Sequence, residues 1–117
     1  MRKSVLVLED EAIVAMDLAA ELSDAGWQVL GPAGSIPEAI RLIEIELPDA
    51  AVLDVNLSGT KSFDLAKTLR DRGCSVLFLT GYAKDTIPAH LSDAPVVAKP
   101  VDPAALTRQL AAIGRPE

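Results

Sequence analysis

The 117-residue sequence contains a single cysteine, few aromatic residues (3%) and no run of basic side chains. Because Cys74 has no second cysteine to pair with, nothing in the composition requires an oxidising compartment, and a cytoplasmic protein is predicted. The chain has 17 acidic and 11 basic side chains, which gives a net charge of −6. Such a chain lacks the basic surface that binds nucleic acid or an anionic membrane, so we expect neither partner.

A long apolar run is missing as well. The run from Val5 to Leu8 ends at Glu9, Asp10 and Glu11, and it is too short for a signal sequence or a membrane span. A chain of this length buries roughly 65% of its surface on folding, which is enough for one layered core. We therefore expect a single domain over residues 1–117, with no effector domain.

Short apolar segments alternate with stretches of helical periodicity, a pattern typical of a parallel sheet covered by helices on both faces. Five strands are predicted, at residues 4–8, 28–30, 50–53, 76–79 and 96–98. Between them, apolar residues three or four positions apart give each predicted helix one buried stripe. These positions are Val14, Leu18 and Leu22; Ile36, Ile40, Ile43 and Leu47; Leu65 and Leu69; and Leu106, Leu110 and Ile113.

Capping signals agree with these helices. Ser35 and Glu38 have the spacing of a capping box, and Asp102 precedes a proline at the first helical position. Helix ends are predicted at Gly26, Gly73 and Gly114.

Other segments receive structural predictions. A short or mobile helix is predicted at residues 83–91, because Pro88 interrupts the helical pattern there. Residues 31–34 predict a turn, since they lack the Gly-Lys-Ser/Thr ending of a phosphate-binding loop. The side chains expected to pack in the core are Cys74, Trp27 and Phe63, and His90 is expected at the surface.

Chemically reactive side chains follow the predicted strands. Glu9 and Asp10 follow the first, Asp54 the third, Thr80 the fourth and Lys99 the fifth. In open parallel sheets, ligands bind at the carboxyl ends of the strands, so these residues are expected to share one edge. Taken alone, each of these residues could have a purely structural role, such as an acidic residue in the first turn of a helix or a solvated residue in a turn. Their shared edge favours a functional site.

Three carboxylates at one edge repel each other unless a cation neutralises them. An oxygen-only ligand set favours a hard divalent ion, and Mg²⁺ is the predicted cofactor. The formal charges of Glu9, Asp10 and Asp54 (−3), the metal (+2) and Lys99 (+1) then sum to zero. Such a site suits receipt of a phosphoryl group, with Asp54 as the nucleophile because its strand is central.

Four motifs in this order resemble the receiver domains of bacterial two-component response regulators: VLVLEDE at 5–11, VLD at 52–54, FLTGY at 78–82 and VAKP at 97–100. The resemblance implies a flavodoxin-like fold, α/β and doubly wound, with a five-stranded parallel sheet in the strand order 2-1-3-4-5. It also implies that the chain works in phosphorelay signal transduction. A sensor histidine kinase or a histidine phosphotransfer protein would phosphorylate Asp54, and the output would be binding to a downstream protein, with a homodimer as one form. The chain would assist its own phosphorylation and dephosphorylation without being an enzyme in the usual sense.

The resemblance also assigns residues to roles. Asp10 would bind Mg²⁺ directly and Glu9 through water, with Asp54 and the Asn56 carbonyl as further ligands. Thr80 and Lys99 would hold the phosphoryl oxygens, and the peptide bond between Lys99 and Pro100 would be cis.

The sequence departs from the family pattern at two places. Val96 stands where an aromatic switch residue is common, so Tyr82, in a motif similar to the Phe-Ala-Thr-Gly-Tyr subgroup, is a hypothetical substitute. Residues 56–59 replace a Met-Pro element. Asn56 and Tyr82 occupy the two family positions that tune autodephosphorylation.

Two other functions are compatible with parts of the pattern. A pseudo-receiver would bind proteins constitutively and carry no phosphate. A phosphatase of the haloacid dehalogenase type would need an acidic residue two positions after its nucleophile, where this chain has Asn56.

Overall fold

The computed structural model describes residues 3–81 and 87–113 of the chain. Tyr82, Gly114 and residues 83–86 of the predicted weak helix lie outside the described residues. The elements are β1 (Ser4–Leu8), α1 (Ala12–Asp24), β2 (Gln28–Ala33), α2 (Ile36–Ile45), β3 (Ala50–Asp54), β4 (Asn56–Leu57), β5 (Thr60–Lys61), α3 (Phe63–Asp71), β6 (Ser75–Thr80), a 3-10 turn η1 (Ala89–Leu91), β7 (Val96–Ala98) and α4 (Pro103–Ile113).

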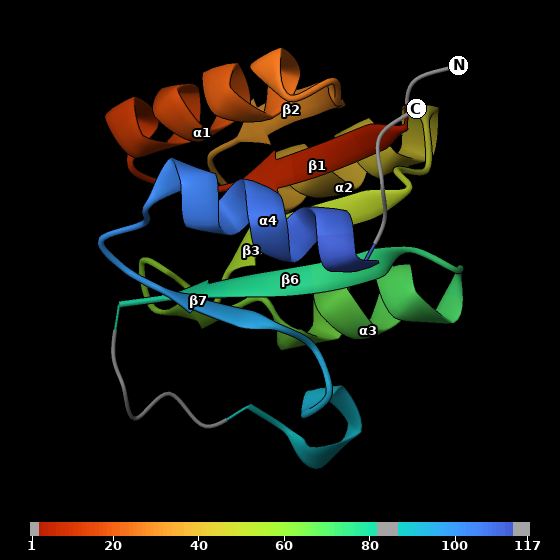
Figure 1. Cartoon of the computed structure of the whole chain (residues 1–117). Helices are drawn as coiled ribbons and strands as arrows, with labels where there is room; N and C mark the ends of the chain where they lie inside the picture. Colours follow the sequence, from red (N-terminus) through yellow and green to blue (C-terminus); the bar gives the residue numbers. More distant parts are fainter. Residues whose placement is uncertain (1–2, 82–86, 114–117) are drawn as a thin grey trace.

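Five strands form one parallel sheet in the order β2-β1-β3-β6-β7. Because β4 and β5 pair only with each other, in a separate antiparallel hairpin, this order is the predicted 2-1-3-4-5. Helices α1 and α4 cover one face of the sheet, while α2 and α3 cover the other (Figure 1). The predicted doubly wound α/β fold is confirmed.

The side chains of the central strands alternate between two cores. Val5 and Val7 of β1 pack with α1 and α4, whereas Leu6 and Leu8 pack with α2 and α3. Every residue of β1 and β3 is buried, which explains why these strands read as continuous apolar runs. Trp27 is fully buried in the first core, and the ring of Phe63 packs edge-on against Phe78, with 5.7 Å between ring centroids.

The predicted helix caps are present, with one difference. The Ser35 side chain accepts the Glu38 N–H at 3.3 Å, but the Glu38 carboxylate accepts the Gly34 N–H rather than that of Ser35. The Asp102 carboxylate accepts the Ala104 N–H at 3.1 Å and so caps α4. Gly26 and Gly73 follow α1 and α3 with positive φ, as expected of residues that end helices.

The stripe predicted for α2 is partly wrong. Ala39 and Ile43 face the sheet and are buried, but Ile40 is 41% exposed. Leu47 lies beyond the end of α2 at Ile45 and is also partly exposed. The helix turns its small residue to the sheet, and Ile40 then lies beside α3, in a surface groove between the two helices.

The turn predicted at residues 31–34 is wrong for Gly31 to Ala33, which continue β2. Leu6 pairs with Leu30 and Leu8 with Ala33, so β2 carries one extra residue as a bulge. Gly31 has φ of +97°, and a Cβ there would lie 2.7 Å from the Ala33 nitrogen. The bulge therefore requires glycine, and it aims the Ala33 carbonyl at the Glu9 N–H, 3.0 Å away.

The described end of the predicted weak helix is the single turn η1. Leu91 buries its side chain against the core that includes α3. Just beyond it, Asp93 accepts two hydrogen bonds from Arg70 of α3, at 2.7 and 2.8 Å. His90 is exposed, as predicted. Within the described ranges, none of the helices is both long and apolar enough to cross a membrane.

Candidate functional site: an acidic pocket at the carboxyl ends of the strands

Three carboxylates meet where β1 and β3 end. Glu9 and Asp10 follow β1 directly, and Asp54 is the last residue of β3. One carboxylate oxygen from each lies within 4.8 Å of the others. Glu9 is 1% exposed and Asp54 4% exposed, whereas Asp10 faces solvent. The structure therefore brings the predicted acidic trio together, with its third member open to water.

Lys99 crosses to this trio from the end of β7. Its Nζ donates to Asp54 Oδ2 at 2.8 Å and to Glu9 Oε1 at 3.0 Å. Glu11 Oε1 is more distant, at 3.7 Å. The peptide bond between Lys99 and Pro100 is cis, as the family resemblance implied. One ammonium group therefore bridges two buried carboxylates from neighbouring strands.

The electrostatics of Glu9 and Lys99 follow from this bridge. Burial raises the pKa of Glu9, the hydrogen bond from Lys99 lowers it, and the charge of Asp54 raises it; the net pKa is raised. Burial also lowers the pKa of Lys99, but its hydrogen bonds to Asp54 and Glu9 outweigh this and raise the pKa above its ordinary value. Lys99 is therefore a fixed positive charge at neutral pH.

The residues of the trio fit a hard divalent cation. The three carboxylates and Lys99 carry a formal charge of −3 + 1 = −2, which one divalent ion neutralises. Glu9 Oε2 is buried and accepts no hydrogen bond of good geometry from the described residues, although Lys99 Nζ lies 2.8 Å away. Among the described residues, the candidate ligands are carboxylate oxygens, the type of ligand that Mg²⁺ prefers. A pocket of about 360 Å³ opens above them, lined by Asp10, Glu11, Asp54, Asn56, Ser58, Gly81 and Lys99.

The β4–β5 hairpin forms one wall of this pocket. Its two turn residues, Ser58 and Gly59, have φ of +52° and +93°, the backbone form of a tight two-residue hairpin. The Asn56 side chain accepts the Gly59 N–H at 3.0 Å and so closes the turn. The Ser58 hydroxyl donates to Asp10 Oδ2 at 3.1 Å. Ser58 was not predicted to belong to the site, although its Ser-Gly pair is a turn signal.

Ser62 holds the end of β3, the strand that carries Asp54. Its hydroxyl is buried and donates to the Asp54 carbonyl at 2.6 Å, while its own N–H bonds to the Val55 carbonyl. Val55 in turn donates to the Leu79 carbonyl of β6. The backbone on which Asp54 sits is therefore held on both sides. Nothing in the local sequence around Ser62 indicated this contact, because it depends on how the hairpin returns to β3.

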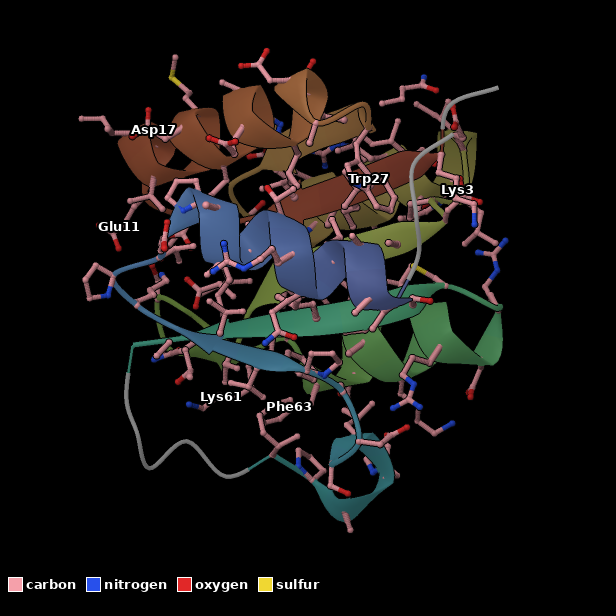
Figure 2. All side chains as sticks on the ribbon, viewed as in Figure 1. Lys3, Glu11, Asp17, Trp27, Lys61 and Phe63 are labelled. Atoms are coloured by element: carbon pink, nitrogen blue, oxygen red, sulfur yellow. The ribbon has the colours of Figure 1, made fainter. Side chains whose placement is uncertain are left out.

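The remaining predicted positions lie around the same edge. Thr80 ends β6, and its carbonyl accepts the Lys99 N–H at 2.8 Å, so the two residues are adjacent across β6 and β7. Val96, in the place of the common aromatic switch residue, is 43% exposed on β7. The labelled Glu11 lies at the end of the molecule where α1 begins (Figure 2).

A doubly wound five-stranded sheet with an acidic trio, a hydroxyl residue and a lysine at its carboxyl edge defines the receiver class of signalling domains. Comparison with known families agrees: residues 5–111 match the model of the response regulator receiver domain. The chain belongs to this family, whose members act as phosphoacceptors in two-component signalling.

Three relatives show the extent of the similarity. The transcriptional regulatory protein PdtaR of Mycobacterium tuberculosis is 30% identical over 112 residues, covering 95% of this chain and 55% of PdtaR. The solution structure of SdrG from Sphingomonas melonis Fr1 is 33% identical with a TM-score of 0.81, covering 95% of each chain. A Burkholderia pseudomallei response regulator, solved with a phosphorylated aspartic acid, a calcium ion and citrate, is 29% identical with a TM-score of 0.79. That match covers 95% of this chain and 66% of the other.

The chain thus spans about half the length of PdtaR, the curated relative named above.

Proposed function

We propose that Asp54 accepts a phosphoryl group from a histidine kinase or a histidine phosphotransfer protein, in a reaction that depends on Mg²⁺. The observation that carries this proposal is the position of Asp54: a buried carboxylate on the central strand, bonded to Lys99 and open to the pocket. The phosphorylated aspartic acid of the Burkholderia pseudomallei relative supports the same chemistry.

Each residue of the site has a part in this reaction. Asp10, Glu9 and the Asn56 carbonyl would hold the cation together with Asp54, and the cation would neutralise charge on the transferred group. Lys99 and Thr80 would contact the phosphoryl oxygens. An acyl phosphate carries roughly −2, against −1 for the free carboxylate. This added charge draws Lys99 towards Asp54 and away from Glu9.

The output of the domain would be a change in protein binding, in the cytosol, to a downstream partner or to a second copy of the chain. With Val96 in place of an aromatic residue, Lys99 and Thr80 remain the groups that can register the new charge. Thr80 ends β6 and Lys99 follows β7, and η1 lies between these two strands in the chain. A shift of Thr80 or Lys99 would therefore alter the surface formed by β7 and η1, to which a partner could bind.

Incubation with Mg²⁺ and acetyl phosphate tests the proposal. Intact-mass spectrometry is expected to show one added phosphoryl group on the wild type and none on Asp54→Asn. Asp64→Asn, an exposed carboxylate in the first turn of α3, is the matched control and should be phosphorylated like the wild type. A chelator should abolish the reaction.

A wild type that gains no phosphoryl group under these conditions, or an Asp54→Asn variant that gains one, would contradict the proposal. The first result would instead favour a pseudo-receiver that binds its partners without phosphate.

A further inference from the structure

The Ser58 side chain of the β4–β5 hairpin contacts the acidic trio. The Ser58 hydroxyl donates to Asp10 Oδ2 at 3.1 Å, across 48 positions of sequence. Asp10 is the exposed member of the trio, and it is the carboxylate with the fewest restraints from the fold, since Glu9 and Asp54 are buried and share Lys99. Among the described contacts, the bond from Ser58 is the one that restrains the Asp10 carboxylate.

The backbone conformation that places the Ser58 hydroxyl near Asp10 is unfavourable for serine. Ser58 has φ of +52°, a left-handed conformation that serine adopts less readily than glycine or asparagine. The turn is held by the Gly59 N–H, which donates to Asn56 Oδ1. Asn56 itself lines the pocket together with Ser58. A residue in this unfavourable conformation with its hydroxyl on a predicted metal ligand suggests a function in orienting that ligand.

We propose that Ser58 is a positioning residue for the divalent cation: its hydroxyl bonds to Asp10 Oδ2, and this bond would hold the carboxylate so that its other oxygen could bind the cation. This inference rests on the proposed function and adds a residue to it. Hydrogen-bond partners of metal-bound groups fix the orientation of the ligand, and their loss weakens metal binding. The hairpin is thereby coupled to the cation, so that binding of the ion would restrain the turn as well as the carboxylates.

Titration of the full chain with Mg²⁺ by isothermal titration calorimetry tests this role without any phosphoryl transfer. We expect Ser58→Ala and Ser58→Gly to bind Mg²⁺ about tenfold more weakly than the wild type, the low end of the range for such partners because the bond is exposed. Ser58→Asn keeps a donor and tolerates positive φ, so it should recover most of the affinity. Thr60→Ala, which removes an exposed hydroxyl from the other strand of the same hairpin, should leave the affinity unchanged.

The variants distinguish the effect of the Ser58 hydroxyl on Mg²⁺ affinity from the effect of the turn conformation. If Ser58→Ala binds weakly but Ser58→Gly binds like the wild type, the effect comes from turn conformation and the inference is wrong. It is also wrong if both variants bind like the wild type, or if Ser58→Asn is as weak as Ser58→Ala. These results leave the proposed function intact, because the wild type still binds Mg²⁺. A wild type that binds no Mg²⁺ would overturn the proposed metal site and this inference together.

Discussion

Replacing Lys99 with methionine tests the electrostatic core of the site. Lys99 Nζ lies 2.8 Å from Asp54 Oδ2 and 3.0 Å from Glu9 Oε1, and both carboxylates are almost fully buried. Removing one partner of a buried ion pair costs about 3–5 kcal/mol, because the remaining charge stays buried and unpaired. The Lys99 side chain is still 18% exposed, and Glu9 can take up a proton. We therefore expect a loss of about 3 kcal/mol at neutral pH, or a fall in Tm of about 12 °C for a chain of this length.

The pH dependence of this loss has a defined sign. Burial raises the pKa of Glu9 in the folded state above its ordinary value of 4.5, and the Lys99 bond opposes that rise. A carboxyl whose pKa is raised by folding favours the folded state most below its ordinary pKa, and that contribution is lost as the pH rises through the folded pKa. Without Lys99, the pKa of Glu9 rises further. At acid pH, Glu9 is protonated in the variant, so no unpaired charge is buried at this position. The loss of folding stability caused by Lys99→Met is therefore larger at about pH 8 than at about pH 5.

Urea unfolding of wild type and variant at both pH values measures the loss. Lys67→Met is the matched control, because Lys67 Nζ lies 2.6 Å from Asp71 Oδ2 but the two side chains are 58% and 63% exposed. That exposed pair should contribute less than about 0.5 kcal/mol. Equal losses for Lys99→Met and Lys67→Met, or a Lys99→Met loss that does not change with pH, would refute the reasoning.

Two further predictions concern the fold. Gly31→Ala should destabilise the chain by at least about 2 kcal/mol, because it combines positive φ with a Cβ 2.7 Å from the Ala33 nitrogen, whereas Gly59→Ala, with similar φ and open space, should cost about 1 kcal/mol. Chemical denaturation measures both, and equal costs would show that the close contact contributes nothing. Burial raises the pKa of the Cys74 thiol to about 12, so a disulfide reagent at about pH 8 should label it only as fast as the chain opens. Labelling of the native chain as fast as that of the urea-unfolded chain would contradict its burial.

Only part of the candidate site could be predicted from the positions of the strand ends. The positions of Glu9, Asp10 and Asp54 at one edge followed from parallel strands alone, because all their carboxyl ends point the same way. The sharing of Lys99 between Glu9 and Asp54 did not, since it depends on a side chain reaching across two strands. Likewise, Asp10 could be placed at the edge, but its bond to Ser58 required the turn of the hairpin to fold back over the pocket.

The turn predicted at Gly31 to Ala33 failed for a related reason. Glycine and proline indicate a turn when only neighbours in sequence are considered. In the folded chain, β1 provides a partner strand, and pairing of Leu8 with Ala33 draws these residues into β2 as a bulge. The exposure of Ile40 also depends on tertiary packing. Periodicity fixes which residues share a helix face, but it does not fix how much of that face the sheet covers.

The sequence by itself determined the alternation of strands and helices, the caps at Ser35 and Asp102, and the edge at which the reactive residues gather. These properties depend on neighbours in the chain and on the two fixed periods of backbone structure. Only the tertiary structure decided that Glu9 is buried beside Lys99, that Ser62 holds Asp54 and that Ser58 reaches Asp10. Such contacts join residues that are not neighbours in the chain, from 8 to 90 positions apart, and their geometry is set by how the elements pack rather than by any local preference.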